Sequence, residues 1–190
     1  DIVLETVRAT TDQSLAGRTV LVTSGATTES IDPIRTLSNR ASGRTGRAVA
    51  TACYARGAAV VLVHDGPEYP WVTVERVESA AEMRDAVLAH AGDADALVSA
   101  AAISDYTVDR APEKLRSGQT DLTIDLEPTP KLIDDVRDSH PEIAIVGFKA
   151  ETAGGEDDVV EKARSFTREP EDEEAEAEVE EAEEVSAGSS

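Results

Sequence analysis

Cysteine and aromatic residues are scarce in this chain of 190 residues. The lone cysteine, Cys53, permits no internal disulfide and no cysteine metal cluster, which fits a reducing compartment. No apolar run approaches the roughly 20 residues that a membrane-spanning helix needs, and residues 1–5 contain no basic leader. We therefore expect a cytoplasmic protein with no membrane partner, and a core built largely from Ala and Val.

Basic residues are the second shortage. The chain has 18 Lys and Arg against 39 Asp and Glu, a net charge of −21, and residues 169–190 hold 11 of the acidic residues and no basic one. Nucleic acid is bound through clustered Lys and Arg, so no nucleic-acid partner is expected. An acidic body, few aromatics and only four lysines are typical of a cytosolic protein from a salt-adapted organism, a halophile.

Short apolar runs alternate with amphipathic segments along most of the chain. This alternation favours an α/β protein with a Rossmann-like, mostly parallel sheet and helices on both faces. In such sheets ligands bind beyond the carboxyl ends of the strands. Strands are expected over residues 19–23, 59–64, 72–77, 96–101, 122–126 and 143–148, and helices over residues 44–56, 80–91, 130–139 and 156–166.

The two ends of the chain differ from this pattern. Residues 1–16 combine a helix-compatible opening with a polar stretch, and we interpret them as a linker or the end of a preceding domain. Residues 17–166 are expected to form the Rossmann-like domain. Residues 167–190 are rich in Glu and Ala, and because their crowded like charges oppose a stable helix, an acidic disordered tail is expected.

The connection between the first strand and its helix, residues 24–43, is long. Such connections usually have about 2–6 residues, so this one is either a functional loop or a misassigned element. Ser42 can cap the following helix, Gly43 permits close backbone approach, and free amides at that helix end make an anion site. Four arginines surround this point in an otherwise acidic protein: Arg35, Arg40, Arg44 and Arg47.

Two further loops follow strands and carry small, charged or aromatic residues. Residues 99–106 offer alanines against which a flat group can lie, with Asp105 as a ligand for an amine or a metal-bridged phosphate; the alternative is tight helix packing with Asp105 as a turn former. Phe148 stands where a nucleotide base could stack on it, or else it is a core aromatic.

Other chemistries find weaker support. The run 42–46, with Asp65 as a ribose ligand, could suggest a dinucleotide-binding dehydrogenase, but the glycine spacing does not match G-x-G-x-x-G. The three histidines have no metal-ligand spacing, and Cys53 has no base near it in the sequence. Zinc chemistry and a nucleophilic cysteine are therefore not expected.

Taken together, these loops resemble the phosphopantothenate–cysteine ligase family over about residues 17–165. The most specific match is D-P-x-R-x-x-S-N-x-x-S-G over residues 32–43. In many prokaryotes this domain is the carboxyl-terminal half of the bifunctional coenzyme A biosynthesis flavoprotein, which would make residues 1–16 the end of a decarboxylase half that binds FMN. The other matching runs are A-A-A-I-S-D-Y at 100–106, E-K-L at 113–115, T-P-K-L at 129–132 and V-G-F-K-A-E-T at 146–152.

The resemblance implies a ligase that joins 4′-phosphopantothenate and L-cysteine in coenzyme A biosynthesis. CTP would activate the phosphopantothenate carboxylate as an acyl-cytidylate with release of pyrophosphate, and the cysteine amine would then displace CMP. Magnesium would be held mainly by the phosphates, so no protein metal ligand is assigned. A homodimer is implied, paired through a short β arm that contains residues 122–126.

The resemblance also assigns the site residues. Asn39 matches the residue that hydrogen-bonds the acyl intermediate, Arg35 its basic neighbour, and Lys114 the lysine that faces the triphosphate. Asp105 and Phe148 match positions near the cytosine. The full set of nucleotide-binding positions is Ser42, Gly43, Ser99, Ala100, Ala101, Asp105, Lys114, Pro130, Lys131, Leu132, Ile133, Phe148 and Lys162.

The chain departs from the family after residue 166. Relatives continue with a Lys-rich segment and a strand that ends in a V-A-N-D-like motif, whereas this chain has the acidic tail. A truncated, non-catalytic chain that binds a nucleotide or pairs with a full-length partner is therefore an alternative to the ligase. Whether the chain prefers CTP or ATP stays open.

Overall fold

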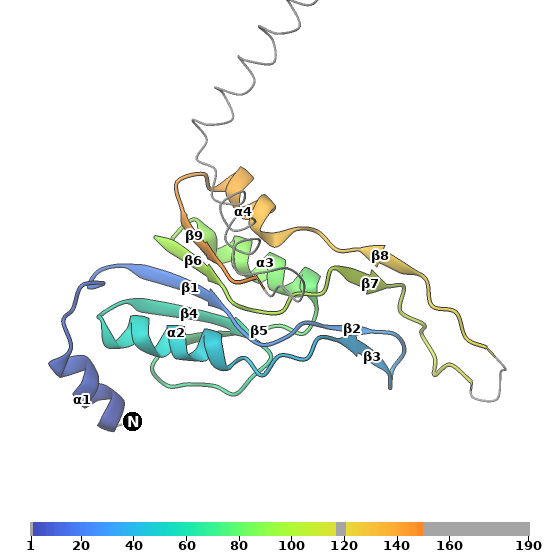
Figure 1. Ribbon diagram of the computed structural model, residues 1–190, viewed down its shortest axis with the longest axis horizontal. Helices are drawn as coiled ribbons and strands as arrows, with labels where there is room; N and C mark the ends of the chain where they lie inside the picture. Colours follow the sequence, from blue (N-terminus) through green and yellow to red (C-terminus); the bar gives the residue numbers. More distant parts are fainter. Residues whose placement is uncertain (1, 117–120, 150–190) are drawn as a thin grey trace, which may run out of the picture. The chain divides into compact units, whose positions relative to one another are not determined.

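A five-stranded parallel sheet forms the centre of the computed structural model, which describes residues 2–116 and 121–149 (Figure 1). The strand order is β5-β4-β1-β6-β9, and all four pairings are parallel. Each strand falls within a range expected from the sequence, so the predicted α/β sheet is confirmed. The strands are β1 (Thr19–Thr23), β4 (Ala59–His64), β5 (Thr73–Arg76), β6 (Ala96–Ser99) and β9 (Ala144–Gly147).

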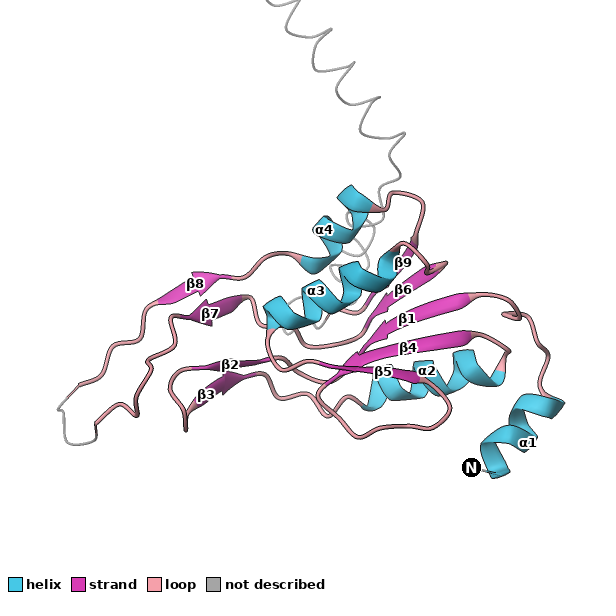
Figure 2. Ribbon diagram, turned by 180° about the vertical axis from the view of Figure 1, so that it is seen from behind, coloured by secondary structure: helices cyan, strands magenta, loops and turns pink. Residues whose placement is uncertain are grey.

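Helices cover both faces of this sheet, because successive side chains of a strand point to opposite faces. In β1, the fully buried Leu21 packs in a cluster with Val87 of α3, while Val20 packs on the other face with Ala50 of α2. Figure 2 shows α3 and α4 on one side of the sheet and α2 on the other. These helices are α2 (Arg44–Ala55), α3 (Ala80–Ala91) and α4 (Leu132–Ser139).

Two short antiparallel hairpins extend from the side of the sheet where β1 and β6 end (Figure 1). One lies within residues 24–43, so part of the long loop is regular structure that the sequence did not reveal. The prediction of a strand over residues 122–126 is wrong in position: Val108 pairs with Leu126, and the strand continues from there. The hairpin strands are β2 (Thr28–Ser30), β3 (Thr36–Ser38), β7 (Tyr106–Val108) and β8 (Leu126–Pro128).

A buried carboxylate ties both hairpins to the helical layer. Glu29 of β2 accepts hydrogen bonds from the backbone N–H of Ala80 (2.9 Å) and from the Thr107 hydroxyl of β7 (2.8 Å). Ala80 is the first residue of α3, where a negative charge also interacts favourably with the helix dipole. The position of the hairpins is therefore set by a side chain that the sequence analysis did not single out.

The segment before residue 17 contacts the domain instead of running free of it. Helix α1 (Ile2–Thr10) carries Arg8, whose guanidinium lies 4.1 Å from the centre of the Tyr54 ring of α2. Gln13 donates to the carbonyl of Ala55 (3.0 Å), and the N–H of Leu15 donates to that of Arg56 (2.9 Å). The linker interpretation did not include these contacts.

Three expectations lie outside the described residues: the helix over residues 156–166, the tail over residues 167–190, and Lys162. Within the described ranges, no helix has both the length and the apolar character needed to cross a membrane.

Candidate functional site

Two loops that follow neighbouring parallel strands are joined by backbone and hydroxyl hydrogen bonds. The N–H of Ala102, after β6, donates to the carbonyl of Gly25, after β1 (2.8 Å), and the N–H of Thr27 donates back to the carbonyl of Ala102 (3.2 Å). Buried hydroxyls add to this: Thr23 accepts from the N–H of Ala101 (3.2 Å), and Thr27 also accepts a backbone N–H. These contacts form a rigid floor at the carboxyl edge of the sheet.

Helix α2 begins directly beside this floor. Its cap residue is Gly43, in the left-handed region with a φ of 66°, and the buried hydroxyl of Ser24 donates to the Gly43 carbonyl (2.9 Å). The prediction that Ser42 caps the helix is therefore wrong: the cap position falls one residue later, at Gly43, which has no side chain to bond the first amides. The first amides of α2 are left to face an anion.

Asn39 lies at the edge of this floor. Its side-chain amide donates to the carbonyl of Ala102 (3.2 Å), the same oxygen that Thr27 uses. Asn39 is otherwise exposed. We call Asn39, Ser42, Gly43 and residues 99–101 the sheet-edge cluster. From the sequence, Asn39 is expected at the reacting carboxylate and the other five residues around the nucleotide.

A second group of expected residues meets at the tip of the β2–β3 hairpin. Asp32 is 1% exposed and forms an ion pair with the Arg35 guanidinium. The N–H of Leu115 donates to the Asp32 carboxylate (3.1 Å), which brings Lys114, an exposed residue, to the same turn. We call Asp32, Arg35, Lys114 and Leu115 the hairpin-tip cluster.

Four donors decide the charge state of Asp32. Burial alone would raise the pKa of this carboxyl, but three backbone N–H groups and the Arg35 guanidinium outweigh that effect and hold the pKa well below its ordinary value. Asp32 is therefore ionised near neutral pH, and its negative charge is paired with Arg35 within the cluster.

The two clusters are separate. Arg35 and Asn39 flank β3, and four residues of extended chain span about 13 Å. The structure thus brings Arg35 and Lys114 together, and it brings Asn39 to the sheet-edge loops, but it holds the two basic residues away from Asn39. An extended ligand with several polar groups suits this spacing better than a small one.

Phe148 is 55% exposed, so the alternative that it is a core aromatic is wrong. Its backbone N–H donates to the carbonyl of Ser99 (3.0 Å), which places residue 148 beside the sheet-edge cluster. Asp105 is exposed and forms a 2.6 Å ion pair with Lys131, and this hydrogen bond raises the pKa of the lysine. Phe148 offers a free ring face, whereas Asp105 must share its carboxylate with Lys131 when it binds an amine.

Residues 130–133 cannot all contact a ligand through their side chains. Leu132 is 4% exposed and packs in the main core cluster, so its predicted contact is limited to its backbone. Pro130, Lys131 and Ile133 are exposed beside it. Thr129, to which the sequence analysis assigned no role of its own, is buried and donates to the Ser104 carbonyl (2.5 Å), which ties this segment to the residue 99–106 loop.

Other catalytic groups are not assembled in the described part of the chain. No group of three or more His, Cys, Asp or Glu side chains there could hold a metal ion. His90 is bonded to Glu75 (3.1 Å), and His64 is buried against the Tyr69 ring. The loops instead supply backbone amides, an amide side chain and positive charge.

We expect Cys53 to react slowly with alkylating agents. The thiol is partly buried in α2, and burial raises its pKa, so less thiolate is present near neutral pH and reactivity increases only as the pH rises. At about pH 7.5, alkylation by iodoacetamide should be at least about tenfold slower than for a free cysteine peptide. Mass spectrometry reads the single site, unfolding in guanidinium chloride serves as the control, and equal rates in folded protein and peptide would contradict the prediction.

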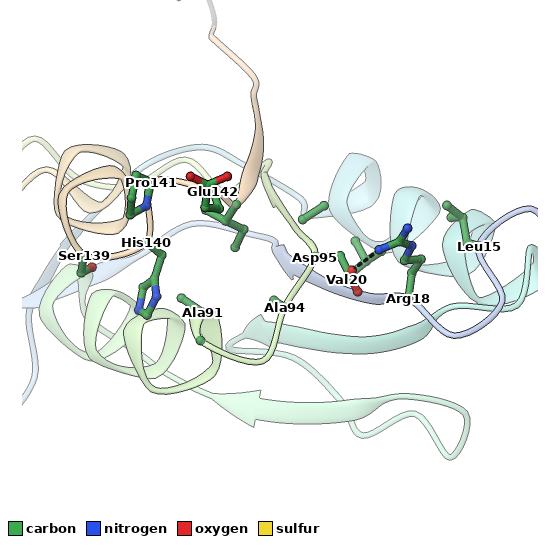
Figure 3. Close-up of a pocket in the computed structure, with 13 residues that line it drawn as sticks. Leu15, Arg18, Val20, Ala91, Ala94, Asp95, Ser139, His140, Pro141 and Glu142 are labelled. Atoms are coloured by element: carbon green, nitrogen blue, oxygen red, sulfur yellow. Dashed lines mark hydrogen bonds and ion pairs between the residues drawn. The ribbon is translucent and has the colours of Figure 1, made fainter. Parts of the chain in front are cut away.

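A hollow in the described surface lies at the other edge of the sheet (Figure 3). It has a volume of about 660 Å³ and lies at the amino ends of the strands, where Arg18 and Asp95 pair with each other at 2.6 Å. Open α/β sheets bind ligands at the opposite edge, and the residues expected to bind substrate are absent from its described lining. We therefore assign the site to the two clusters.

Comparisons with known proteins agree with the motifs. The sequence profile of the DNA/pantothenate metabolism flavoprotein C-terminal domain matches residues 15–170. The chain is 41% identical over 169 residues to the coenzyme A biosynthesis bifunctional protein CoaBC of Thermococcus kodakarensis, covering 86% of this chain and 42% of the relative. It is 39% identical over 170 residues to CoaBC of Mycobacterium tuberculosis, covering 81% and 40%.

Solved structures share the fold. A crystal structure of the C-terminal domain of a CoaBC protein is 31% identical with a TM-score of 0.68, covering 80% of this chain and 74% of that one. A Cab2 mutant in complex with phosphopantothenate-cysteine is 18% identical, with a TM-score of 0.60 and coverage of 80% and 71%, and it shares the fold alone. The chain spans about two fifths of the length of its curated relatives.

Proposed function

Because this chain belongs to the family of the DNA/pantothenate metabolism flavoprotein C-terminal domain, we propose that it is a phosphopantothenate–cysteine ligase of coenzyme A biosynthesis. The observation that carries the proposal is the 41% identity to a CoaBC protein over 169 residues. In this chain, the D-P-x-R-x-x-S-N-x-x-S-G segment forms both the hairpin tip and the loop into α2. Family membership leaves the dehydrogenase alternative without support.

The proposed reaction has two steps. The carboxylate of 4′-phosphopantothenate attacks the α-phosphorus of CTP, which forms an acyl-cytidylate and releases pyrophosphate. The amine of L-cysteine then attacks the acyl carbon, an amide bond forms, and CMP leaves as the C–O bond breaks. Neither step needs a nucleophilic side chain, since positioning and neutralisation of phosphate charge supply the catalysis.

The sheet-edge cluster suits the acyl-cytidylate. Asn39 is held by its bond to the Ala102 carbonyl, so its amide is ready to hydrogen-bond the acyl-phosphate group. The free amides at the start of α2 attract phosphate oxygens. The ring of Phe148 offers a stacking surface for the base beside Ser99 and the small residues Ala100 and Ala101. In this assignment Asp105 and Lys131 contact the base as a pair.

The hairpin-tip cluster suits the other anionic groups. Arg35 and Lys114 place positive charge along the line that leads away from Asn39, where a phosphate of CTP or of phosphopantothenate can lie. Magnesium fits this site as an ion carried by the triphosphate, because it keeps much of its water and needs few carboxylates. When bound, it would neutralise phosphate charge beside Lys114. We assign CTP, rather than ATP, from the family resemblance.

We also propose that the protein works as a cytoplasmic homodimer. The β7–β8 arm exposes several apolar side chains, of which Tyr106, Leu122 and Leu126 are each about half exposed. Exposed apolar clusters of this kind mark interaction surfaces, and an arm that meets its own copy would cover them. A mass near 40 kDa in size-exclusion chromatography with light scattering, twice the 20.1 kDa chain, is the expected result.

The test of the ligase is pyrophosphate release from CTP in the presence of phosphopantothenate, with product formation dependent on L-cysteine. Assays at high salt suit a chain with a net charge of −21. Asn39→Ala is expected to lower the rate by about 100-fold, since it removes a donor to the acyl intermediate. Gln13→Ala, which removes an amide on the far side of α2, is the matched control and should keep the wild-type rate.

The outcomes separate the two readings of this chain. Release of pyrophosphate that requires phosphopantothenate supports the ligase. Binding of CTP without release, measured by calorimetry, would instead support the truncated, non-catalytic chain. If the Asn39→Ala variant were as active as Gln13→Ala, the assignment of Asn39 to the site would be wrong.

A further inference from the structure

Asp32 accepts more hydrogen bonds than any other carboxylate in the described part of the chain. One oxygen, Oδ1, accepts from the backbone N–H groups of Ile34 and Arg35, both at 2.7 Å. The other, Oδ2, accepts from the Arg35 guanidinium and from the N–H of Leu115 (3.1 Å). Asp32 is only 1% exposed, and both of its carboxylate oxygens are hydrogen-bonded within the protein.

These four bonds do two different jobs. The two on Oδ1 close a local turn, as Asp commonly does with the backbone two or three residues on. The two on Oδ2 reach beyond the turn: one orients Arg35, and the other crosses 83 residues of sequence to the loop between β7 and β8. Arg35 also donates to the Leu115 carbonyl (3.2 Å), so the triangle is closed.

The described part of the loop, residues 109–116, has few other attachments to the hairpin. Among the described residues 109–116, one further backbone bond to the hairpin is present, from the N–H of Ala111 to the carbonyl of Ile31 (2.9 Å). Lys114 lies between these two attachment points, and its side chain is exposed. The direction in which Lys114 leaves the loop therefore depends on whether Leu115 is bonded to Asp32.

We propose that Asp32 is a positioning residue that holds Arg35 and the Lys114–Leu115 peptide in one arrangement, so that two cations face the substrates as a preformed pair. The inference rests on the proposed function for the roles of Arg35 and Lys114. Fixing charged groups in advance avoids reorganisation during the reaction. A buried carboxylate is suited to this because its charge is satisfied only when all its donors are in place.

Two substitutions test whether Asp32 positions Arg35 and the Lys114–Leu115 peptide. Asp32→Asn turns one of the two oxygens into an NH₂ group, which must then face N–H donors in either orientation. Asp32→Ser keeps a hydroxyl that can close the local turn but cannot reach Leu115. Asp95→Asn is the matched control: it removes the ion pair with Arg18 at the opposite edge of the sheet, while the remaining amide oxygen can still accept the Thr19 N–H (2.8 Å).

Three measurements are made on the full chain: the rate of pyrophosphate release, the melting temperature, and hydrogen exchange of the peptide that covers residues 109–116. Both Asp32 variants are expected to be at least about tenfold slower than Asp95→Asn at saturating substrates, and to exchange faster in this peptide. Adding Lys114→Ala to Asp32→Ser is expected to cost less than the product of the two single losses, because both changes remove the placed Lys114, and only the displacement of Arg35 adds to the loss of Lys114→Ala.

The contrary results are distinct. Three results would each show that Asp32 is not a positioning residue. The Asp32 variants could match Asp95→Asn in rate, or exchange in residues 109–116 could be unchanged. The rate losses of the Asp32 and Lys114 variants could also multiply as independent effects. If wild type releases no pyrophosphate, the proposed function fails, while the exchange measurement still decides whether Asp32 holds the loop.

Discussion

Replacing Lys114 by alanine is expected to lower the rate of pyrophosphate release by about 1000-fold at saturating CTP and phosphopantothenate. Removing a cation that stabilises a transferring phosphoryl group commonly costs about 10³–10⁵ in rate. Lys114 is one of four lysines in the chain, and it lies beside Arg35 through the contact of Leu115 with Asp32. The proposed function predicts that the loss falls on kcat more than on KM.

Two control variants make this result specific. Lys114→Arg keeps the charge but changes the geometry of the donor, so it should recover part of the rate. Arg56→Ala removes one positive charge at the exposed carboxyl end of α2, away from both clusters, and should leave the rate unchanged. If Arg56→Ala slowed the reaction as much as Lys114→Ala, the effect would come from net charge and not from a placed cation.

Gly46→Ala is expected to destabilise the fold by about 3 kcal/mol and to disrupt the sheet-edge cluster as well. A Cβ at this position would lie 2.5 Å from the Ser24 Cβ and 2.8 Å from the carbonyl oxygen of Thr23. Ser24 is buried and Thr23 is in the central strand, so neither can move without shifting β1 or α2. The melting temperature should fall by roughly 6–12 °C.

Gly92→Ala is the matched control for this substitution. Gly92 follows α3 with a φ of −66°, and an added Cβ would meet only the His140 ring at 3.5 Å, which is ordinary contact. Its melting temperature should stay within about 3 °C of wild type, since the substitution also restricts the unfolded chain. Equal melting temperatures for the Gly46 and Gly92 variants would show that α2 does not pack as closely on β1 as the structure indicates.

The positive charge of the site stands out against the rest of the molecule. The chain carries a net −21, yet Arg35 and Lys114 share one turn, and the Asp32 charge there is already paired with Arg35. Under the proposed function, a ligand with several phosphates is attracted to this turn and to the amides at the start of α2, and the acidic remainder of the chain repels it. The proposed nucleotide is therefore compatible with the acidity of the chain, because a nucleotide needs only local positive charge, whereas nucleic acid needs an extended basic surface.

The sequence by itself determined the main elements and the family. Runs such as residues 19–23 and 59–64 are mostly apolar because a parallel strand is buried on both faces. These signals are local, so they can be read without knowing which strand neighbours which. The same holds for the D-P-x-R-x-x-S-N-x-x-S-G segment.

Only the tertiary structure decided which of the site residues stand together. The strands β2, β3 and β7 have three residues each, too few to show a period, and they form because partners elsewhere in the chain pair with them. The bonds of Asp32 to Leu115 and of Glu29 to Ala80 cross 83 and 51 residues. A hydrogen bond depends on distance in space, and no local pattern records where a folded chain brings two distant residues into contact.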